Sequence, residues 1–95
     1  MIKSFRHRGL ARYFRDPRYT DKRGINGALA KRLIFILDAL DTIERAEEMD
    51  ISGLYFHRLK GKRKNEFAIR VSGNWRVTWK MESLDVTEVN LEDYD

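Results

Sequence analysis

The sequence contains no cysteine and only two histidines, which stand apart from any cluster of metal-binding residues. Without cysteine there is no disulfide framework and no thiolate ligand for zinc, so we expect no metal and no cofactor. The longest apolar run, residues 33–37, is far shorter than the roughly 20 residues that span a bilayer. The first residues also lack the apolar core of an export signal. We therefore expect a cytoplasmic protein without a membrane partner.

Several catalytic motifs are missing as well. The chain has no glycine-rich phosphate loop, no His-Glu-x-x-His pattern and no recognisable Ser/His/Asp arrangement. These absences exclude nucleotide-dependent enzymes, zinc proteases and serine hydrolases. A DNA-binding regulator is disfavoured too, because no short glycine-containing turn leads from the long predicted helix to a basic recognition helix. RNA binding and RNA cleavage remain.

The chain has 95 residues, of which 42% are hydrophobic and 36% are charged, and this predicts one compact domain over residues 1–95. Its charge is arranged in blocks. Residues 1–32 and 55–80 have net charges of +8 and +7, whereas residues 33–54 and 81–95 have −5 and −6. The basic blocks suit a polyanion such as a nucleic acid. The alternative is a solvated surface on which basic and acidic segments pair with each other.

Apolar spacing predicts two helices in the first half of the chain. Leu10–Phe14 has the i, i+3, i+4 pattern of a short helix that Pro17 terminates. The apolar positions of Asn26–Ile43 keep helical spacing for about five turns, with Asn26 as the N-cap. Before and between these helices we expect a short strand over residues 1–6 and a basic loop over residues 16–24.

Period-two alternation then predicts strands over Phe67–Val71, Trp75–Met81 and Val86–Tyr94, with a hairpin turn at Gly73-Asn74. Two N-terminal helices followed by a meander indicate an α+β fold, in which the helices pack on one face of a small, mainly antiparallel twisted sheet. The side chains expected to face the helices are Trp75, Val77 and Trp79, with Thr87, Val89 and Leu91 from the last strand. Those expected on the opposite, uncovered face are Arg76, Thr78 and Lys80, with Glu88, Asn90, Glu92 and Tyr94.

The segment from Phe56 to Lys64 places His57 beside five cations. A histidine can accept or donate a proton near neutral pH, and cations stabilise the charge that builds on a phosphate under attack. RNA supplies its own nucleophile, the 2′-hydroxyl, so this chemistry needs no metal. Each residue also has a structural interpretation. Arg76 is often the cross-strand partner of an acidic residue such as Glu88 or Glu92, Tyr94 an edge-covering aromatic, and Trp75 and Trp79 core residues.

Four segments, in family order and covering nearly the whole chain, resemble the HigB branch of the RelE-like toxins. They are Met1-Ile-Lys-Ser-Phe-Arg-His-Arg-Gly-Leu, His57-Arg-Leu-Lys60-Gly, Asn74-Trp-Arg76-Val and Glu92-Asp-Tyr94-Asp. The resemblance implies the RelE-like microbial RNase fold. It also implies the toxin of a type II toxin–antitoxin system, a metal-independent and ribosome-dependent endoribonuclease. Such a toxin cleaves mRNA by 2′-hydroxyl attack and arrests translation.

The resemblance further implies partners and site residues. The partners are mRNA in the 30S decoding site, with contacts to 16S rRNA, and a helix-turn-helix antitoxin of the HigA type; operator DNA is contacted only through the toxin–antitoxin complex. The implied catalytic residues are His57, Lys60, Arg76 and Tyr94. The residues expected to bind RNA are Arg58, Lys62, Arg63, Lys64, Arg70, Lys80 and Asp93.

The chain departs from the family pattern at two positions. Arg58 stands where proline is usual, and the chain ends in Tyr94-Asp95 where the family often has Tyr-His. A carboxylate at the end places negative charge near a phosphate, so we expect lower activity or a changed codon preference. The alternative function is a catalytically weakened RelE-like homologue that acts as an RNA- or antitoxin-binding module. Its residues look nearly the same, so the sequence leaves both functions open.

Overall fold

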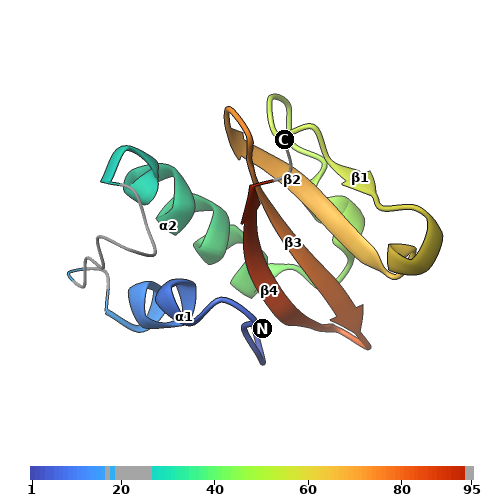
Figure 1. The fold of residues 1–95 in the computed structure, drawn as a ribbon. Coiled ribbons are helices and arrows are strands. Elements are labelled where there is room, and N and C mark those ends of the chain that lie inside the picture. Colours follow the sequence, from blue (N-terminus) through green and yellow to red (C-terminus); the bar gives the residue numbers. More distant parts are fainter. Residues whose placement is uncertain (17, 19–26, 94–95) are drawn as a thin grey trace.

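The computed structural model describes residues 1–16, 18 and 27–93. Two helices precede a sheet of four strands in the spatial order β1-β2-β3-β4, and each strand is antiparallel to its neighbour. The elements are α1 (Arg8–Arg15), α2 (Gly27–Thr42), η1 (Ala46–Met49), β1 (His57–Arg58), η2 (Gly61–Arg63), β2 (Glu66–Ser72), β3 (Trp75–Glu82) and β4 (Asp85–Asp93). Figure 1 shows both helices on one side of the sheet. The predicted α+β architecture is confirmed.

Local signals account for the ends of helix α1. The Nδ1 atom of His7, the N-cap, accepts a hydrogen bond from the Leu10 amide at 3.0 Å, which satisfies one of the free amides of the first turn. The helix ends before Asp16, which has the extended backbone that a residue before proline favours. The predicted cap at Asn26, and the predicted loop of residues 16–24 apart from Asp16 and Arg18, lie outside the described residues.

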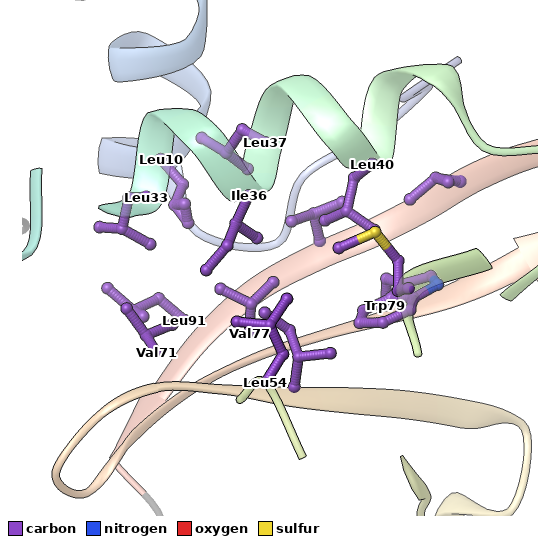
Figure 2. Packing of buried hydrophobic residues seen from close by; sticks show 14 of the residues in the cluster. Leu10, Leu33, Ile36, Leu37, Leu40, Leu54, Val71, Val77, Trp79 and Leu91 are labelled. Atoms are coloured by element: carbon purple, nitrogen blue, oxygen red, sulfur yellow. The ribbon is translucent and has the colours of Figure 1, made fainter. Parts of the chain in front are cut away.

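The core fills the space between helix α2 and the sheet. Leu33, Ile36 and Leu40 of α2 are fully buried. Figure 2 shows Ile36 directed toward Val77 and Leu40 toward Trp79 of β3, and Leu33 above Leu91 of β4. Period 3.6 on the helix and period 2 on the strand thus bring two apolar faces together. Replacing one such leucine or isoleucine with alanine typically costs about 2–5 kcal/mol.

Helix α1 is attached to this core from the side. Leu10 is fully buried, and the Tyr13 hydroxyl donates a hydrogen bond to the Ala30 carbonyl of α2 at 2.8 Å. On the other side of the core, Trp79 packs against Phe56 and Phe67, with ring centroids 6.2 and 6.1 Å away. The helices and these aromatic rings leave the second face of the sheet to polar side chains.

The first six residues form less regular structure than predicted. They run parallel to β4 through two isolated bridges, Ile2↔Val86 and Phe5↔Val89, rather than as a strand of the sheet. The Lys3 amide donates to the Val86 carbonyl at 2.8 Å, so the segment pairs with an edge that would otherwise expose free backbone groups.

One predicted face is wrong. Strand β4 has an irregularity opposite Thr78 and Lys80, and Glu88 there has a φ of 52°, as in a β-bulge. Beyond the bulge Thr87 pairs with Lys80, so its side chain lies on the face away from the helices and not with Val89. Between these pairs β4 has two residues opposite one residue of β3. The prediction assumed strict alternation over residues 86–94 and so did not include this extra residue.

Candidate functional site

We call the face of the sheet turned away from the helices the outer face. The strand register defines its members: His57, Glu66, Ala68, Arg70, Arg76, Thr78, Lys80, Thr87, Asn90 and Glu92. His57, Ala68, Thr78 and Asn90 form one row across the sheet, and Arg70, Arg76 and Glu92 form the next. Trp75, Val77 and Trp79 alternate with these residues on β3, as predicted.

The register brings His57 and Arg76 onto the same face in adjacent rows. With strands about 4.8 Å apart and a rise of about 3.4 Å per residue, their Cα atoms are separated by about 12 Å. The residue between them on β2, Ala68, has the smallest side chain of the row and is fully buried. His57 and Arg76 thus lie on either side of Ala68 on one face of the sheet.

His57 is exposed and has a defined tautomer. Its Nδ1 atom lies 2.9 Å from the Tyr55 carbonyl oxygen. Because a carbonyl oxygen only accepts hydrogen bonds, Nδ1 is the donor, so in the neutral ring Nε2 is the nitrogen with the lone pair. This arrangement is the one that a general base requires, with the basic nitrogen directed away from the backbone.

Lys60 lies just beyond β1, in a loop that is bound to strand β2 through the residue before it, Leu59. The amide of the preceding residue, Leu59, donates to the Glu66 carbonyl at 2.9 Å, and the Leu59 side chain is buried. Gly61 follows with a φ of 65°, which a glycine adopts without strain. The Lys60 side chain is exposed, and within the described residues it has no hydrogen-bond or ion-pair partner. Its ammonium group is thus available to a ligand.

Arg76 is held by its direct cross-strand neighbour, Glu92. Nε and Nη2 of Arg76 lie 3.2 and 3.1 Å from Oε1 of Glu92. Thr78 and Asn90 donate to the other carboxylate oxygen at 3.1 and 3.2 Å. The structural interpretation of Arg76 as an ionic partner of Glu92 is confirmed. The same contacts fix the direction of the guanidinium group, so they are compatible with a role toward phosphate.

A second arginine, Arg63, also binds Glu92. Its guanidinium group contacts Glu92 on β4 and donates two 2.9 Å hydrogen bonds to Glu66 on β2. Because β3 lies between these strands, the Arg63 side chain must cross over β3, where Thr78 is fully buried. The outward direction of Thr78 was predicted correctly, but the centre of the outer face is covered by ion pairs and not open.

The ion pairs change the protonation behaviour of the carboxylates. Burial opposes ionisation of Glu92, but hydrogen bonds from Arg63 and Arg76 outweigh it and lower the pKa of Glu92 to about 2. The hydrogen bond from Arg63 likewise lowers the pKa of Glu66, and the hydrogen bonds to both carboxylates raise the pKa of Arg63. This part of the outer face therefore stays ionised throughout the neutral range.

The remaining predicted RNA-binding residues lie in several places. Arg58 is on the opposite side of β1 from His57, with its guanidinium carbon 5.0 Å from the centre of the Phe67 ring. Lys62 and Lys64 are exposed on and beside η2. The structure thus brings Lys62 and Lys64 close to Lys60 along the chain, whereas Arg58 points away from His57.

The other predicted residues lie toward β4 or at the free edge of β2. Lys80 forms a 3.0 Å ion pair with Glu88, and Asp93 is the last residue of β4, opposite Trp75. Arg70 is exposed on the outer face, directly opposite Arg76. Tyr94 and Asp95 lie outside the described residues, so the predicted role of Tyr94 stays a prediction.

Sequence reasoning missed one residue beside this site, Tyr55. Its ring is 67% exposed, its carbonyl orients His57, and the Arg70 guanidinium carbon lies 5.6 Å from the ring centre. The signal in the sequence was a tyrosine two residues before the candidate base. It was not used because Tyr55 precedes the alternating pattern of the strands.

In the described part of the chain, no group of three or more His, Cys, Asp or Glu residues is placed to hold a metal ion. The described helices include none that is both long and apolar enough to cross a membrane.

Comparison with known proteins gives two findings. Residues 3–94 match the family described as the RelE-like toxin of the type II toxin–antitoxin system HigB. The chain is also 35% identical over 94 residues to the protein named Endoribonuclease HigB from Proteus vulgaris, and the match covers 99% of each chain. Both similarities extend over the helices and the whole sheet.

Proposed function

The chain belongs to the HigB-like family of RelE-like toxins of type II toxin–antitoxin systems, and we propose that it is an endoribonuclease whose reaction takes place on the outer face between His57 and Arg76. One observation carries the assignment of the site. The hydrogen bond from His57 Nδ1 to the Tyr55 carbonyl leaves Nε2 as a base on the same sheet face as Arg76.

In the proposed reaction His57 Nε2 accepts the proton of a ribose 2′-hydroxyl group. The 2′-oxygen then bonds to the adjacent phosphorus, and the bond from phosphorus to the 5′-oxygen breaks. The products are a 2′,3′-cyclic phosphate and a free 5′-hydroxyl end. Arg76, oriented by Glu92, stabilises the charge that accumulates on the phosphate oxygens.

The departing 5′-oxygen needs a proton. Among the three described candidates, an arginine does not release its protons, and the neutral His57 begins as the base. Lys60, whose ammonium group is exposed, is therefore the proton donor in this proposal. The predicted contribution of Tyr94, orientation of the nucleotide by stacking or hydrogen bonding, completes the set.

We further propose that the substrate is mRNA in the decoding site of the ribosome, with contacts to 16S rRNA. General acid–base assistance supplies about 10²- to 10⁴-fold in rate, so much of the acceleration must come from positioning the RNA for in-line attack. His57 and Lys60 are exposed on a sheet face and its adjoining loop, and a ribosome-bound message supplies the order that such a surface lacks. This substrate places the protein in the cytoplasm.

The second proposed partner is a helix-turn-helix antitoxin of the HigA type. Membership in a type II toxin–antitoxin family implies an antitoxin protein. Operator DNA is then bound through the complex and not by this chain alone.

The test is a translation reaction with ribosomes and a defined message, in which cuts are mapped by primer extension. We expect His57→Ala to reduce the cleavage rate by about 10²- to 10⁴-fold and Arg76→Ala by about 10²- to 10³-fold. Lys60→Ala tests the proton donor. Lys31→Ala, which removes an exposed lysine from α2, is the matched control and should cleave like the wild type.

Two outcomes would contradict the proposal. If His57→Ala cuts at the wild-type rate, His57 is not the base. If the wild type makes no cuts at any concentration but still binds RNA or the antitoxin, the chain is the catalytically weakened binding module. Asp95, which follows Tyr94 where the family often has histidine, is the sequence feature that favours this second function.

A further inference from the structure

Tyr55 is held in an unusual position beside the candidate base. It has a φ of 53°, a left-handed conformation that is uncommon for residues other than glycine. Both neighbours fix the backbone there: Leu54 is buried and its carbonyl accepts from the Arg70 amide at 2.7 Å, while Phe56 packs against Phe67. A large aromatic ring is thereby kept in solvent although its neighbours are in the protein.

Arg70 contacts the exposed Tyr55 ring. Its guanidinium carbon lies 5.6 Å from the centre of the Tyr55 ring, and its Nε donates to the Gly73 carbonyl at 3.2 Å. Among the residues that the structure describes, no carboxylate pairs with Arg70. It stands directly opposite Arg76, whose charge Glu92 compensates. The charge of Arg70 is therefore available to an anionic ligand.

A shallow hollow lies next to the tyrosine. It has a volume of about 310 Å³ and is lined mainly by polar groups, among them Arg32 of α2, Gly53, Tyr55, Arg70, Ser72 and Gly73. It lies at the end of β2 beyond the two residues that pair with strand β1. An aromatic face and two guanidinium groups in one open hollow match the two parts of a nucleotide, a flat base and a phosphate.

We propose that Tyr55 and Arg70 form a stacking subsite for the base of a nucleotide that flanks the scissile phosphate, with Arg32 and Arg70 contacting the neighbouring phosphate. This subsite rests on the proposed function, because His57 defines where the scissile phosphate lies. The His57–Tyr55 hydrogen bond ties the two positions together, so a base on Tyr55 belongs to a nucleotide adjacent to the reacting one. The cationic lining favours RNA over a protein ligand.

The subsite should add affinity with little sequence preference, since every base has an aromatic face. Stacking of one base on an aromatic side chain contributes between about 5-fold and about 150-fold in affinity. We therefore expect Tyr55→Ala to raise the half-saturating toxin concentration by an amount in this range, with less than about a threefold change in the maximal cleavage rate. Tyr55→Phe keeps the ring and should behave like the wild type. Both alanine and tyrosine are restricted at the positive φ of residue 55, so Tyr55→Ala should keep the backbone of the wild type.

The experiment measures single-turnover cleavage on ribosomes programmed with a defined message. Three messages are compared: one intact, and two that lack the base immediately 5′ or 3′ of the cut nucleotide pair. Removing the stacked base should weaken binding of the wild type and of Tyr55→Phe but not of Tyr55→Ala. If the loss is the same for wild type and Tyr55→Ala with both messages, the subsite does not exist.

Two further outcomes separate the possibilities. If Tyr55→Ala cleaves like the wild type but is neutralised less well by the antitoxin, the hollow is a protein-binding surface and the RNA proposal is overturned. If the wild type makes no cuts, the proposed function fails first. The subsite is then tested by binding of a short RNA with a 2′-deoxy nucleotide at the cut position, for which equal affinities of Tyr55→Ala and wild type reject it.

Discussion

The two ends of the outer face use arginine and lysine in different ways. Toward β4, Arg63 and Arg76 share the carboxylate of Glu92, and Lys80 pairs with Glu88. Toward β1, Lys60 and Arg70 have no carboxylate partner within the described residues, and they stand beside an exposed imidazole and an exposed tyrosine. We call these the paired end and the open end.

A basic block in the sequence thus contains two kinds of cation, those paired with carboxylates and those without a carboxylate partner in the described part of the chain. Residues 60–64 hold four cations within five residues. Within the described part of the chain, Arg63 is the one among them that contacts carboxylates, because the turn η2 directs it back over β3. Cations at the paired end hold the sheet surface in one arrangement, and cations at the open end are available for a polyanion. The net charge of a segment does not distinguish the two kinds.

The largest expected difference is in stability, between a variant that neutralises a paired cation, Arg63, and one that neutralises its neighbour Lys62. Arg63→Met removes the main partner of Glu66, whose side chain is only 8% exposed and whose other cation, Arg6, lies 3.9 Å away. Leaving such a carboxylate without its partner should lower the free energy of unfolding by about 3 kcal/mol. Lys62→Met makes the same change of charge one residue earlier and should alter it by less than about 0.5 kcal/mol. Urea unfolding at neutral pH measures both.

Equal stabilities of these two variants would contradict the division of the outer face. A loss in Lys62→Met as large as that in Arg63→Met would show that the whole turn, and not the ion pair, stabilises the sheet.

The next effect is a dependence of stability on pH. The pKa of Glu92 is about 2 in the folded protein, against about 4.3 in an unfolded chain. Because the folded pKa is the lower one, Glu92 contributes stability above about pH 5, and this contribution is lost as the pH falls through the folded pKa. The shift corresponds to about 3 kcal/mol, and solvent screening of the partly exposed ion pairs reduces it, so Glu92→Gln should cost about 2 kcal/mol at pH 7. Its difference from the wild type should shrink toward pH 2.

Unfolding of both proteins at a series of pH values measures this difference. Glu82→Gln, at the exposed end of β3, is the control and should follow the wild type at every pH. A difference between Glu92→Gln and wild type that stays constant down to pH 2 would mean that the carboxylate charge is not what stabilises the paired end.

The sequence predicted the parts of the fold that depend on local periodicity. The spacing of Leu33, Ile36 and Leu40 identified the buried side of α2, and alternation on β3 placed Val77 and Arg76 on the correct faces. In both cases the pattern of burial is itself the repeat of the element, so one sequence is enough to detect it.

The bulge in β4 could not be predicted in this way, because residues far away in the sequence fix it. The Ser4 hydroxyl accepts from the Glu88 amide at 2.9 Å, and the Ser4 carbonyl accepts from the Val89 amide at 3.1 Å. The turned Glu88 side chain then lies between Arg6 and Lys80. Alternation in residues 85–93 contains no sign of this partner segment.

Only part of the candidate site could be predicted, because some of its contacts also join residues that are far apart in the sequence. His57, Lys60 and Arg76 were identified from the types of residue and from the family resemblance, and the register places His57 and Arg76 on one face. The engagement of Arg63 was not foreseen, because its partner Glu92 is 29 residues away. Tyr55 was missed because its exposure results from a positive φ that no pattern of apolar residues indicates.

The smallest expected effect tests whether the open end is an RNA-binding surface. Each cation that contacts a phosphate of single-stranded RNA contributes about 0.7 to the slope of log affinity against log salt concentration. Lys62→Met and Lys64→Met should each reduce that slope by about this amount for a short RNA with a 2′-deoxy nucleotide at the cut position, while stability stays unchanged. Lys31→Met, on α2, provides the baseline. If the slope is the same for all three variants, Lys62 and Lys64 do not contact phosphate, and the open end is confined to His57, Lys60 and the Tyr55–Arg70 hollow.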